Sequence, residues 1–239
     1  MREQPQEKSK KKKSKVPPIP LVKTIEKVHA GISQLNRSLV PAASTVLEMI
    51  LGGWLSQAIY VAAELEIADH LKFGPKSIEE LADRTNTHER SLYRLLRMLA
   101  SHGLFQEDKE GQFSQTPLSE SLRSDHPSTV RRVAIYQGGF HWKHWERLLY
   151  AIRTGKPSVD DIEEATFFDL LNKKPELGTI FDQAMTELSA LSQDSIVKAF
   201  DFSPFKKIVD VGGGQGKLLE AILEAKYLQT REYRTDSPS

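Results

Sequence analysis

Apolar residues recur at helical spacing along most of the chain. The first such stretch covers residues 21–37, and its apolar side chains fall on one face of the predicted helix. They are Leu21, Ile25, Val28, Ile32 and Leu35. A second stretch, residues 42–71, is apolar with few interruptions and predicts one long or broken helix. The apolar face of the first helix lies far from the main body of the sequence, and such a face often packs on a partner.

Residues 77–114 predict two short helices followed by a hairpin. Ser77 with Glu80 is a capping-box start for the first helix. Thr87 is the predicted cap of the second helix, residues 88–101, which stops at Gly103. Two short strands, residues 104–107 and 111–114, are joined by a charged turn. Helix, helix and hairpin in this order indicate a winged helix.

Winged helices often bind DNA, and the second predicted helix carries a basic face. Arg90, Arg94 and Arg97 fall on one side of it, as in a helix that reads a DNA groove. Acidic residues are also frequent in this region, and they oppose a polyanion. An ordinary solvated helix face is therefore the favoured interpretation.

Residues 129–191 are predicted to be mostly helical. Trp142 lies on a helix that ends at Gly155, and the apolar face of this helix would line either a pocket or a core. Phe181 and Met185 lie four residues apart on a later helix, which is also the spacing of ordinary core residues.

Two histidines in this region have a spacing that could ligate a metal. They are His141 and His144. No third ligand stands at a matching spacing in the sequence, so we expect no metal site.

The strongest chemical signal is a strand that breaks into a glycine turn and then a helix. Residues 208–211 read as a short buried strand, and apolar residues at helical spacing follow from Leu218. The glycines between them permit positive φ and let a ligand approach the backbone and the free N–H groups of the new helix. They are Gly212, Gly213, Gly214 and Gly216.

The spacing of this turn separates three kinds of nucleotide site. A phosphate-binding P-loop needs glycine at Val211 and Ser or Thr at Leu218, so that interpretation fails. A dinucleotide fingerprint starting at Gly212 needs glycine or alanine at Lys217, so that match is poor. What remains is a carboxylate, Asp210, followed by spaced glycines. A carboxylate suits a ligand that carries positive charge and no phosphate.

This pattern resembles the first motif of the class I S-adenosylmethionine-dependent methyltransferases. From Trp54 to Leu223 the chain is similar to the small-molecule O-methyltransferases with an N-terminal dimerisation domain, the group of plant caffeate-type and bacterial polyketide-type enzymes. The resemblance implies a cofactor, S-adenosyl-L-methionine, and a set of binding residues. Cofactor-binding residues would be Asp210, Gly212, Gly213, Gly214, Gly216, Ser189 and Met185. Substrate-binding residues would be Phe181, Met185 and Trp142.

The implied fold class is α/β, mostly α as present. A winged-helix dimerisation domain would be followed by the start of a Rossmann-like methyltransferase domain. The predicted divisions are a disordered basic tail at residues 1–20, the dimerisation domain at 21–125, a helical connector lining the active site at 126–200, and the methyltransferase domain at 201–239. In the family the general base is a histidine well beyond the glycine motif, so no catalytic residue is assigned.

Composition limits the remaining possibilities. There are 33 Lys and Arg against 32 Asp and Glu, so the overall charge gives no reason to expect a polyanionic partner. The absence of cysteine excludes disulfides and is compatible with a cytoplasmic location. The most apolar region, residues 46–71, is interrupted by glycines and charged residues, so we expect no membrane span and no membrane partner. The lysine-rich run at residues 8–15 reads as a solvated tail, although nuclear import and contacts with nucleic acid or anionic membranes use similar runs.

The end of the chain departs from the family. Residues 226–239 contain no apolar strand run, and no acidic residue there is placed to bind the ribose. The strand at 208–211 would therefore lack neighbours on both edges. We expect a truncated gene product or a frameshift near Ala225, with negligible methyl transfer by this polypeptide alone.

The leading hypothesis is an O-methyltransferase that acts on a small hydroxylated, phenolic or polyketide-like acceptor and forms a homodimer through its N-terminal domain. The alternatives are a non-catalytic dimerisation partner and a winged-helix regulator that binds DNA. The acceptor itself cannot be read from these residues.

Overall fold

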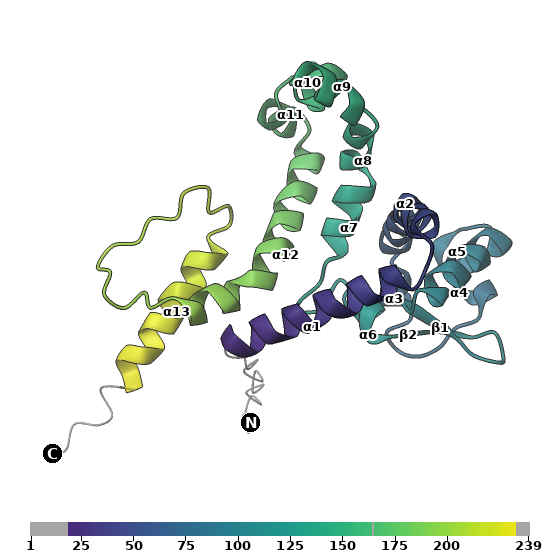
Figure 1. The fold of residues 1–239 in the computed structure, drawn as a ribbon, viewed down its shortest axis with the longest axis horizontal. Coiled ribbons are helices and arrows are strands. Elements are labelled where there is room, and N and C mark those ends of the chain that lie inside the picture. Colours follow the sequence, from purple (N-terminus) through teal and green to yellow (C-terminus); the bar gives the residue numbers. More distant parts are fainter. Residues whose placement is uncertain (1–18, 164, 233–239) are drawn as a thin grey trace, which may run out of the picture. The chain divides into compact units, whose positions relative to one another are not determined.

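The structure is a computed structural model that describes residues 19–163 and 165–232. The lysine-rich run therefore lies outside the described residues. The chain divides into two compact units, Met1–Thr45 and Val46–Ser239. In the first unit, α1 (Ile19–Ser38) forms the predicted helix, coloured purple in Figure 1. The five apolar side chains of its predicted face are between 49% and 62% exposed, so within its own unit this face has no covering.

The predicted helix over residues 42–71 is present in its broken form, as α2 (Ala42–Glu64) and α3 (Ile67–His70). The break lies at Glu66, which adopts a left-handed φ of 53°. By length and composition α2 could cross a membrane, so the expectation that no stretch reaches this length was wrong. The Gly52 and Gly53 pair stays helical, and α2 carries only two charged residues. Core helices that are mostly buried pass the same test, but only 17% of the apolar stretch of α2 is buried, and its buried residues are Ala58, Ala62 and Ala63.

The predicted winged helix is confirmed in its elements. It contains α4 (Ile78–Thr85), α5 (Glu89–Ser101), β1 (Phe105–Glu107) and β2 (Phe113–Gln115), with β1 and β2 antiparallel. The Ser77 hydroxyl accepts a hydrogen bond from the Glu80 N–H and caps α4, as predicted. The predicted cap of α5 was wrong, because the His88 imidazole accepts the Ser91 N–H there. The Thr87 hydroxyl instead forms a hydrogen bond with the Thr85 hydroxyl. A short helix, α6 (Pro117–Glu120), follows β2.

One hydrophobic core joins these elements. Phe105 and Phe113 from the two strands are at most 1% exposed, and they meet the inner faces of α2, α4 and α5. The rest of the core is Ala58, Ala62, Ile67, Leu71, Leu81, Ala82, Leu92, Leu96 and Leu99. Burial of this many apolar side chains accounts for the stability of a module of this size.

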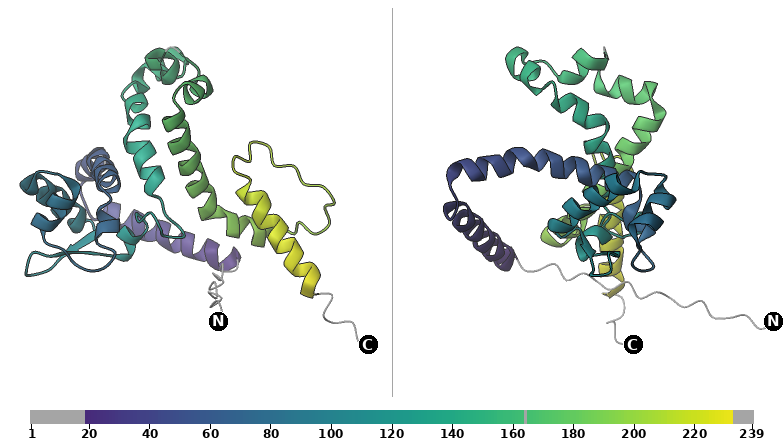
Figure 2. Two further views of the ribbon diagram at one scale, coloured as in Figure 1. Left: turned by 180° about the vertical axis from the view of Figure 1, so that it is seen from behind. Right: turned by 90° about the vertical axis from the view of Figure 1, so that its right-hand side faces the viewer.

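The region between the module and the glycine turn is helical, as predicted. Helices α7 and α12 run side by side, and the short helices lie at their far end (Figures 1 and 2). The elements are α7 (Arg131–Gly138), α8 (Phe140–Trp145), α9 (Leu148–Thr154), α10 (Ser158–Glu163), α11 (Phe167–Lys173) and α12 (Pro175–Ala199). A Cβ on Gly138 would lie 2.2 Å from the Cβ of Tyr60, so glycine allows the end of α7 to contact α2.

Two charged side chains, Arg131 and Glu187, fix the start of α7 through three hydrogen bonds. The buried Arg131 guanidinium donates to the Ala63 carbonyl at 3.0 Å and to the Glu66 carboxylate at 2.7 Å. From the other side, the Glu187 carboxylate of α12 accepts the Val133 N–H at 3.1 Å. Burial raises the pKa of Glu187, although this hydrogen bond and one from the Arg132 backbone oppose the rise. Glu187 thus serves as a helix cap supplied by a different helix.

The predicted strand at residues 208–211 was wrong. Residues 200–216 have turns and irregular backbone, and the strands among the described residues are β1 and β2. Val209 and Val211 are 71% and 91% exposed. A strand needs a neighbour for its N–H and C=O groups, and no described residues pair with this segment. The helix predicted after the glycines is present as α13 (Lys217–Glu232), which packs against α12.

Candidate functional site

The glycine turn has the backbone geometry that its sequence predicts. Gly212, Gly214 and Gly216 have φ values of 75°, 52° and 69°. Residues with a Cβ rarely adopt this left-handed region, and the strain is about 1 kcal/mol or more. The Gly216 N–H donates to the Gly213 carbonyl at 2.8 Å, which closes the turn immediately before α13.

Asp210 lies directly against this turn. A Cβ on Gly213 would be 2.4 Å from the Asp210 Oδ2, a separation that side chains do not tolerate. Glycine at position 213 therefore leaves room for the carboxylate beside the open backbone. This places a negative charge next to a turn whose amides can contact a ligand.

A cavity of about 650 Å³ lies between the glycine turn and one face of α12. Its size is within the range of about 300 to 1,000 Å³ that small-molecule sites usually have. Most of the sequence-predicted site residues meet here, although two of the nine do not line it. Those that do are Phe181, Met185, Ser189, Asp210, Gly212, Gly213 and Gly214.

Trp142 and Gly216 are the two that lie elsewhere. Gly216 closes the turn from behind. Trp142 lines a separate cavity of about 530 Å³, the Trp142 cavity, together with Tyr60 and Tyr136. Its ring lies over Gly53 of α2, where an added Cβ would approach the ring to 3.4 Å. A substrate-binding role for Trp142 stays a prediction.

Sequence reasoning missed several residues of the first cavity. They are Phe168, Asp182, Thr186, Gln215, Lys217 and Leu218. A signal for Asp182 and Thr186 was present, because they extend the positions of Phe181, Met185 and Ser189 into one helical stripe. Phe168 had no such signal, since the fold of α11 against α12 brings it close.

Aromatic rings extend from this cavity into the helical region. Phe181 lies edge-on to Tyr136 and Phe167, with ring centroids 5.6 Å and 5.1 Å away. Tyr136 in turn stacks on His141 at 5.4 Å. Edge-on and stacked rings at these distances attract one another, and they form an aromatic wall of which Phe181 lines the cavity. Such a wall suits a flat aromatic ligand.

The two histidines of the candidate metal pair are His141 and His144 of α8. Among the described residues, no group of three or more metal-ligating side chains comes together. The His144 Nδ1 donates to the Phe140 carbonyl at 3.1 Å, and its buried Nε2 has no hydrogen-bond partner among the described residues. Burial, and secondarily the neighbouring His144, lower the pKa of His141 and favour its neutral form.

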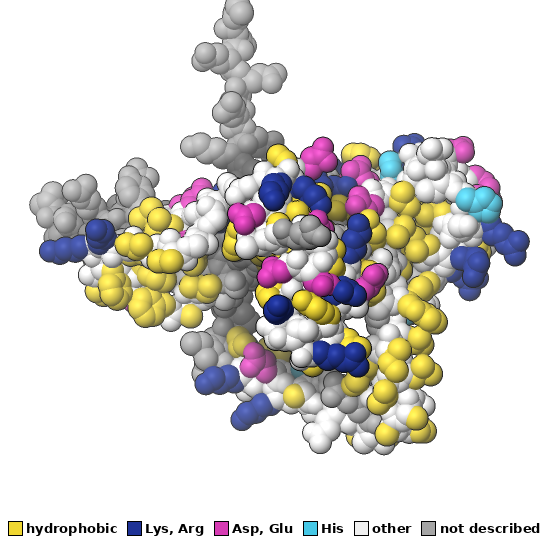
Figure 3. Space-filling view, turned by 90° about the horizontal axis from the view of Figure 1, so that it is seen from above, with side chains coloured by type: hydrophobic (Ala, Val, Ile, Leu, Met, Phe, Trp, Pro, Cys, Tyr) yellow, Lys and Arg dark blue, Asp and Glu magenta, His cyan; other side chains and the backbone are white. Residues whose placement is uncertain are grey.

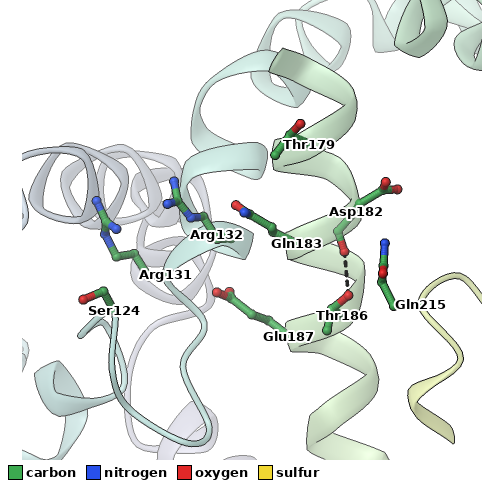
Figure 4. A pocket seen from close by; sticks show the side chains of 9 residues that line it. All are labelled: Ser124, Arg131, Arg132, Thr179, Asp182, Gln183, Thr186, Glu187 and Gln215. Carbon is green, nitrogen blue, oxygen red and sulfur yellow. Dashed lines mark hydrogen bonds between the residues drawn. The ribbon is translucent and has the colours of Figure 1, made fainter. Parts of the chain in front are cut away.

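A second cavity of about 650 Å³ lies beside the first and is polar (Figure 4). It shares Asp182, Thr186 and Gln215 with the first cavity. In Figure 4, Gln215 lies on one side of α12, and Arg131 and Arg132 lie on the other, at the start of α7. The Thr186 hydroxyl donates to the Asp182 backbone carbonyl at 2.8 Å, so this bond leaves the Asp182 carboxylate unused.

Two family models match the chain. The O-methyltransferase dimerisation domain matches residues 47–125, and the O-methyltransferase domain matches residues 145–238. The first range contains the winged-helix module, and the second contains α12, the glycine turn and α13.

Individual proteins of known activity resemble the chain over most of its length. It is 40% identical over 196 residues to the phenazine O-methyltransferase PhzM of Lysobacter antibioticus, which covers 82% of this chain and 58% of the relative. It is 37% identical to the mitomycin biosynthesis 6-O-methyltransferase of Streptomyces lavendulae, over 77% of this chain and 53% of the relative. The chain thus spans little more than half the length of these relatives.

Solved structures give the same result. LaPhzM has a TM-score of 0.75 at 40% identity, covering 78% of this chain and 56% of that one. The neocarzinostatin-biosynthesis methyltransferase NcsB1 has a TM-score of 0.60 at 35% identity, covering 72% and 53%. That structure contains S-adenosylmethionine and 2-hydroxy-5-methyl naphthoic acid, and the structure of CalO1 contains the demethylated product.

Proposed function

Because the chain belongs to the S-adenosylmethionine-dependent O-methyltransferases that carry a dimerisation domain, we propose that it holds this cofactor in the site of an O-methyltransferase for a small hydroxylated, phenolic or polyketide-like acceptor. The observation that carries the proposal is the meeting of the predicted residues in one cavity. The Asp210 carboxylate, the open glycine backbone and the α12 stripe line a single space of adequate size. These residues fit a ligand that is cationic, has no phosphate and needs close contact with the backbone.

The residues divide into two groups by chemistry. Asp210 and the glycine amides would hold the amino-acid and ribose part of the cofactor, with Ser189 as a further hydrogen-bonding group. Met185 and Phe181 follow on the same face of α12, where an acceptor ring would lie against Phe181 and the rings behind it. S-adenosylmethionine, when bound, supplies an electrophilic methyl group on a sulfonium.

Positioning is the main catalytic contribution that the described residues can make. The aromatic wall would hold a flat acceptor, and the α12 stripe would hold it close to the glycine turn. No imidazole lines the cavity among the described residues, and a carboxylate is a weak base for a phenol. We therefore expect residues 1–239 alone to show negligible methyl transfer.

The apolar faces of α1 and α2 favour a homodimer. The apolar face of α1 is exposed within its own unit, and several apolar side chains of α2 are also exposed. Ile50 and Trp54 of α2 are each 67% exposed, and Figure 3 shows a column of hydrophobic side chains where Figure 1 places α2. Apolar faces of this kind are usually covered in solution. A second copy of the chain is the occupant we propose, because the matching family model for residues 47–125 is a dimerisation domain.

Calorimetric titration with S-adenosylmethionine and S-adenosylhomocysteine tests the proposal. Saturable binding of one molecule per chain is expected, and Asp210→Ala should weaken it by about tenfold, as expected for loss of a charge-assisted contact. A chain that binds neither compound would instead be a non-catalytic dimerisation partner. Incubation of residues 1–239 with labelled donor and phenolic acceptors checks the expected lack of turnover, and methylated product above the protein-free background would contradict it.

Sedimentation equilibrium tests the dimer separately. The wild-type chain should sediment at twice its monomer mass, and Trp54→Lys should shift it toward monomer. Arg94→Lys, a change on a neighbouring helix that preserves charge, is the matched control and should leave the dimer intact. A monomeric wild-type chain at micromolar concentration would contradict the proposed second copy.

A further inference from the structure

The first cavity contains two carboxylates, and sequence reasoning assigned only one of them. Asp210 comes from the glycine turn, and Asp182 comes from α12, one position after Phe181. Asp182 is exposed to the cavity, and its backbone carbonyl, not its carboxylate, accepts the Thr186 hydroxyl. Within the described part of the chain, neither carboxylate forms an ion pair.

The lysine that lines the first cavity does not neutralise the charges of Asp182 and Asp210. Lys217 also lines the cavity, but its ammonium pairs with Glu220 of the same helix at 2.8 Å. Two arginines line the neighbouring polar cavity. Arg131 pairs with Glu66 at 2.7 Å, and the charge of Arg132 acts on Glu187. Two uncompensated carboxylates in one cleft create a negative potential, and such a cleft favours a positively charged ligand.

S-adenosylmethionine and its demethylated product differ in net charge. S-adenosylmethionine carries a sulfonium and an ammonium against one carboxylate, whereas S-adenosylhomocysteine has lost the sulfonium charge. Methyl transfer breaks the S–CH₃ bond, leaves the electron pair on sulfur and forms the O–CH₃ bond, while the hydroxyl proton goes to a base. The ligand in the cavity thus changes from cationic to neutral overall.

We propose that Asp182 is a second donor-binding carboxylate, which makes the cavity favour cationic S-adenosylmethionine over neutral S-adenosylhomocysteine. This inference rests on the proposed function. The Asp182 carboxylate attracts the cationic donor more strongly than the neutral product, so the same side chain promotes donor binding and product release. The position of Asp182 between the two cavities, beside Thr186 and Gln215, places its charge next to both.

Equilibrium dialysis of the full 239-residue chain measures this preference. Three probes are compared: S-adenosylmethionine, S-adenosylhomocysteine, and sinefungin, which carries an amine in place of the sulfonium methyl. Asp182→Asn should lower affinity for the two cationic probes on the order of fivefold, as expected for loss of a partly exposed charge interaction. Affinity for S-adenosylhomocysteine should change by less than about twofold.

A matched control lies on the same helix. Asp194→Asn removes an exposed carboxylate of α12 that lies outside the cavity and near Lys198 at 3.9 Å, so it should leave all three affinities unchanged. If Asp182→Asn lowers the affinity for all three probes equally, Asp182 affects the shape of the cavity and does not distinguish charged from neutral ligands, and the inference is wrong. Unchanged affinities also overturn it. Failure of the wild-type chain to bind any probe would overturn the proposed function as well, and so differs from both results.

Salt dependence gives a second measurement on the wild-type protein. Added salt screens charges, so raising ionic strength from about 0.01 M to about 0.15 M should reduce the preference for S-adenosylmethionine. In Asp182→Asn the preference should be smaller at the start and less sensitive to salt. An equal salt response in the two proteins would contradict a role for the Asp182 charge.

Discussion

The sequence predicts strands from short apolar stretches both in the winged-helix module and in the glycine segment, residues 200–216. Only the predicted strands of the module are present in the structure. Residues 104–107 and 111–114 have a partner close by in sequence, so a short turn brings β1 and β2 together. Residues 208–211 have no partner among the described residues and stay irregular. The comparison teaches that a short apolar run indicates a tendency to form a strand, while strand pairing itself depends on a neighbour.

Side-chain burial also differs between the winged-helix module and the glycine segment. Phe113 of β2 is fully buried, whereas Val211, at the end of the predicted strand, is 91% exposed. Two apolar side chains with similar strand propensity thus differ by whether a core exists around them. The same contrast allows stability and ligand binding to be tested separately in the two regions.

The largest expected effect comes from truncating the core of the module. Leu96 is fully buried on the inner face of α5, so Leu96→Ala should lower the free energy of unfolding by about 2 to 5 kcal/mol. Lost transfer energy and the remaining cavity both contribute. Urea unfolding followed by circular dichroism measures the change.

Val211→Ala is the control for this experiment. As an exposed residue in an irregular segment, it should cost less than about 0.5 kcal/mol. A cost near that of Leu96→Ala would mean that residues 208–211 are packed as a strand in solution, and the contrast between the two regions would be lost.

Local features were predictable from sequence, and features that depend on distant contacts were not. The Ser77 cap and the positive φ of the glycines depend on a few adjacent residues, whereas the sequence left open whether the helix over residues 42–71 is broken and did not locate the break at Glu66. The cap of α5 was misplaced by one residue, because a histidine at position 88 performs a role more typical of Thr or Ser. Errors of this size at a helix end are small, since the helix itself is set by its apolar face.

The candidate site shows the same limit. The stripe on α12 and the glycine turn could be found from spacing, and resemblance to a family joined them into one site. Spacing alone did not separate Trp142 from the first cavity, because its contact with Gly53 joins residues far apart in sequence. Nor did it identify Glu187 as the cap of α7. Such contacts follow from helix packing, which a linear pattern does not encode.

Two glycines with nearly equal φ, one in each region, allow the effect of the same backbone strain to be compared between the two regions. Gly111 in the hairpin turn has a φ of 76°, and Gly212 has a φ of 75°. Alanine at either position should be strained by about 1 to 2 kcal/mol. In Gly111→Ala the strain should appear as lower stability of the module. In Gly212→Ala it should appear as roughly tenfold weaker binding of S-adenosylhomocysteine, because the turn lines the cavity.

Each glycine variant is the control for the other. Unfolding measurements and ligand titrations on both variants give four results, of which two should be large and two small. If Gly212→Ala lowers global stability as much as Gly111→Ala does, the glycine segment contributes to the cooperative core. If Gly111→Ala weakens binding equally, strain in the hairpin is transmitted to the cavity.

The smallest expected effect concerns a surface ion pair of the module. Lys72 at 2.6 Å, and then Arg123 at 2.7 Å, lower the pKa of Asp125 to about 2. The folded-state pKa is therefore below the ordinary value of 3.8. The stabilisation is present above that ordinary value and is lost as pH falls through the folded-state value. The stability difference between wild type and Asp125→Asn should accordingly shrink between about pH 4 and pH 2.

Asp201 gives the matched measurement in the glycine segment. Its pKa is also lowered, but the cause is the N–H and hydroxyl of Ser203, two residues away. A contact that local can persist in the unfolded chain, so it contributes less to the difference between folded and unfolded states. Thermal melts of Asp125→Asn and Asp201→Asn at low salt should therefore show a clear pH dependence only for Asp125. A similar dependence for Asp201 would mean that residues 200–216 unfold together with the module, and that the two regions differ in pairing but not in cooperativity.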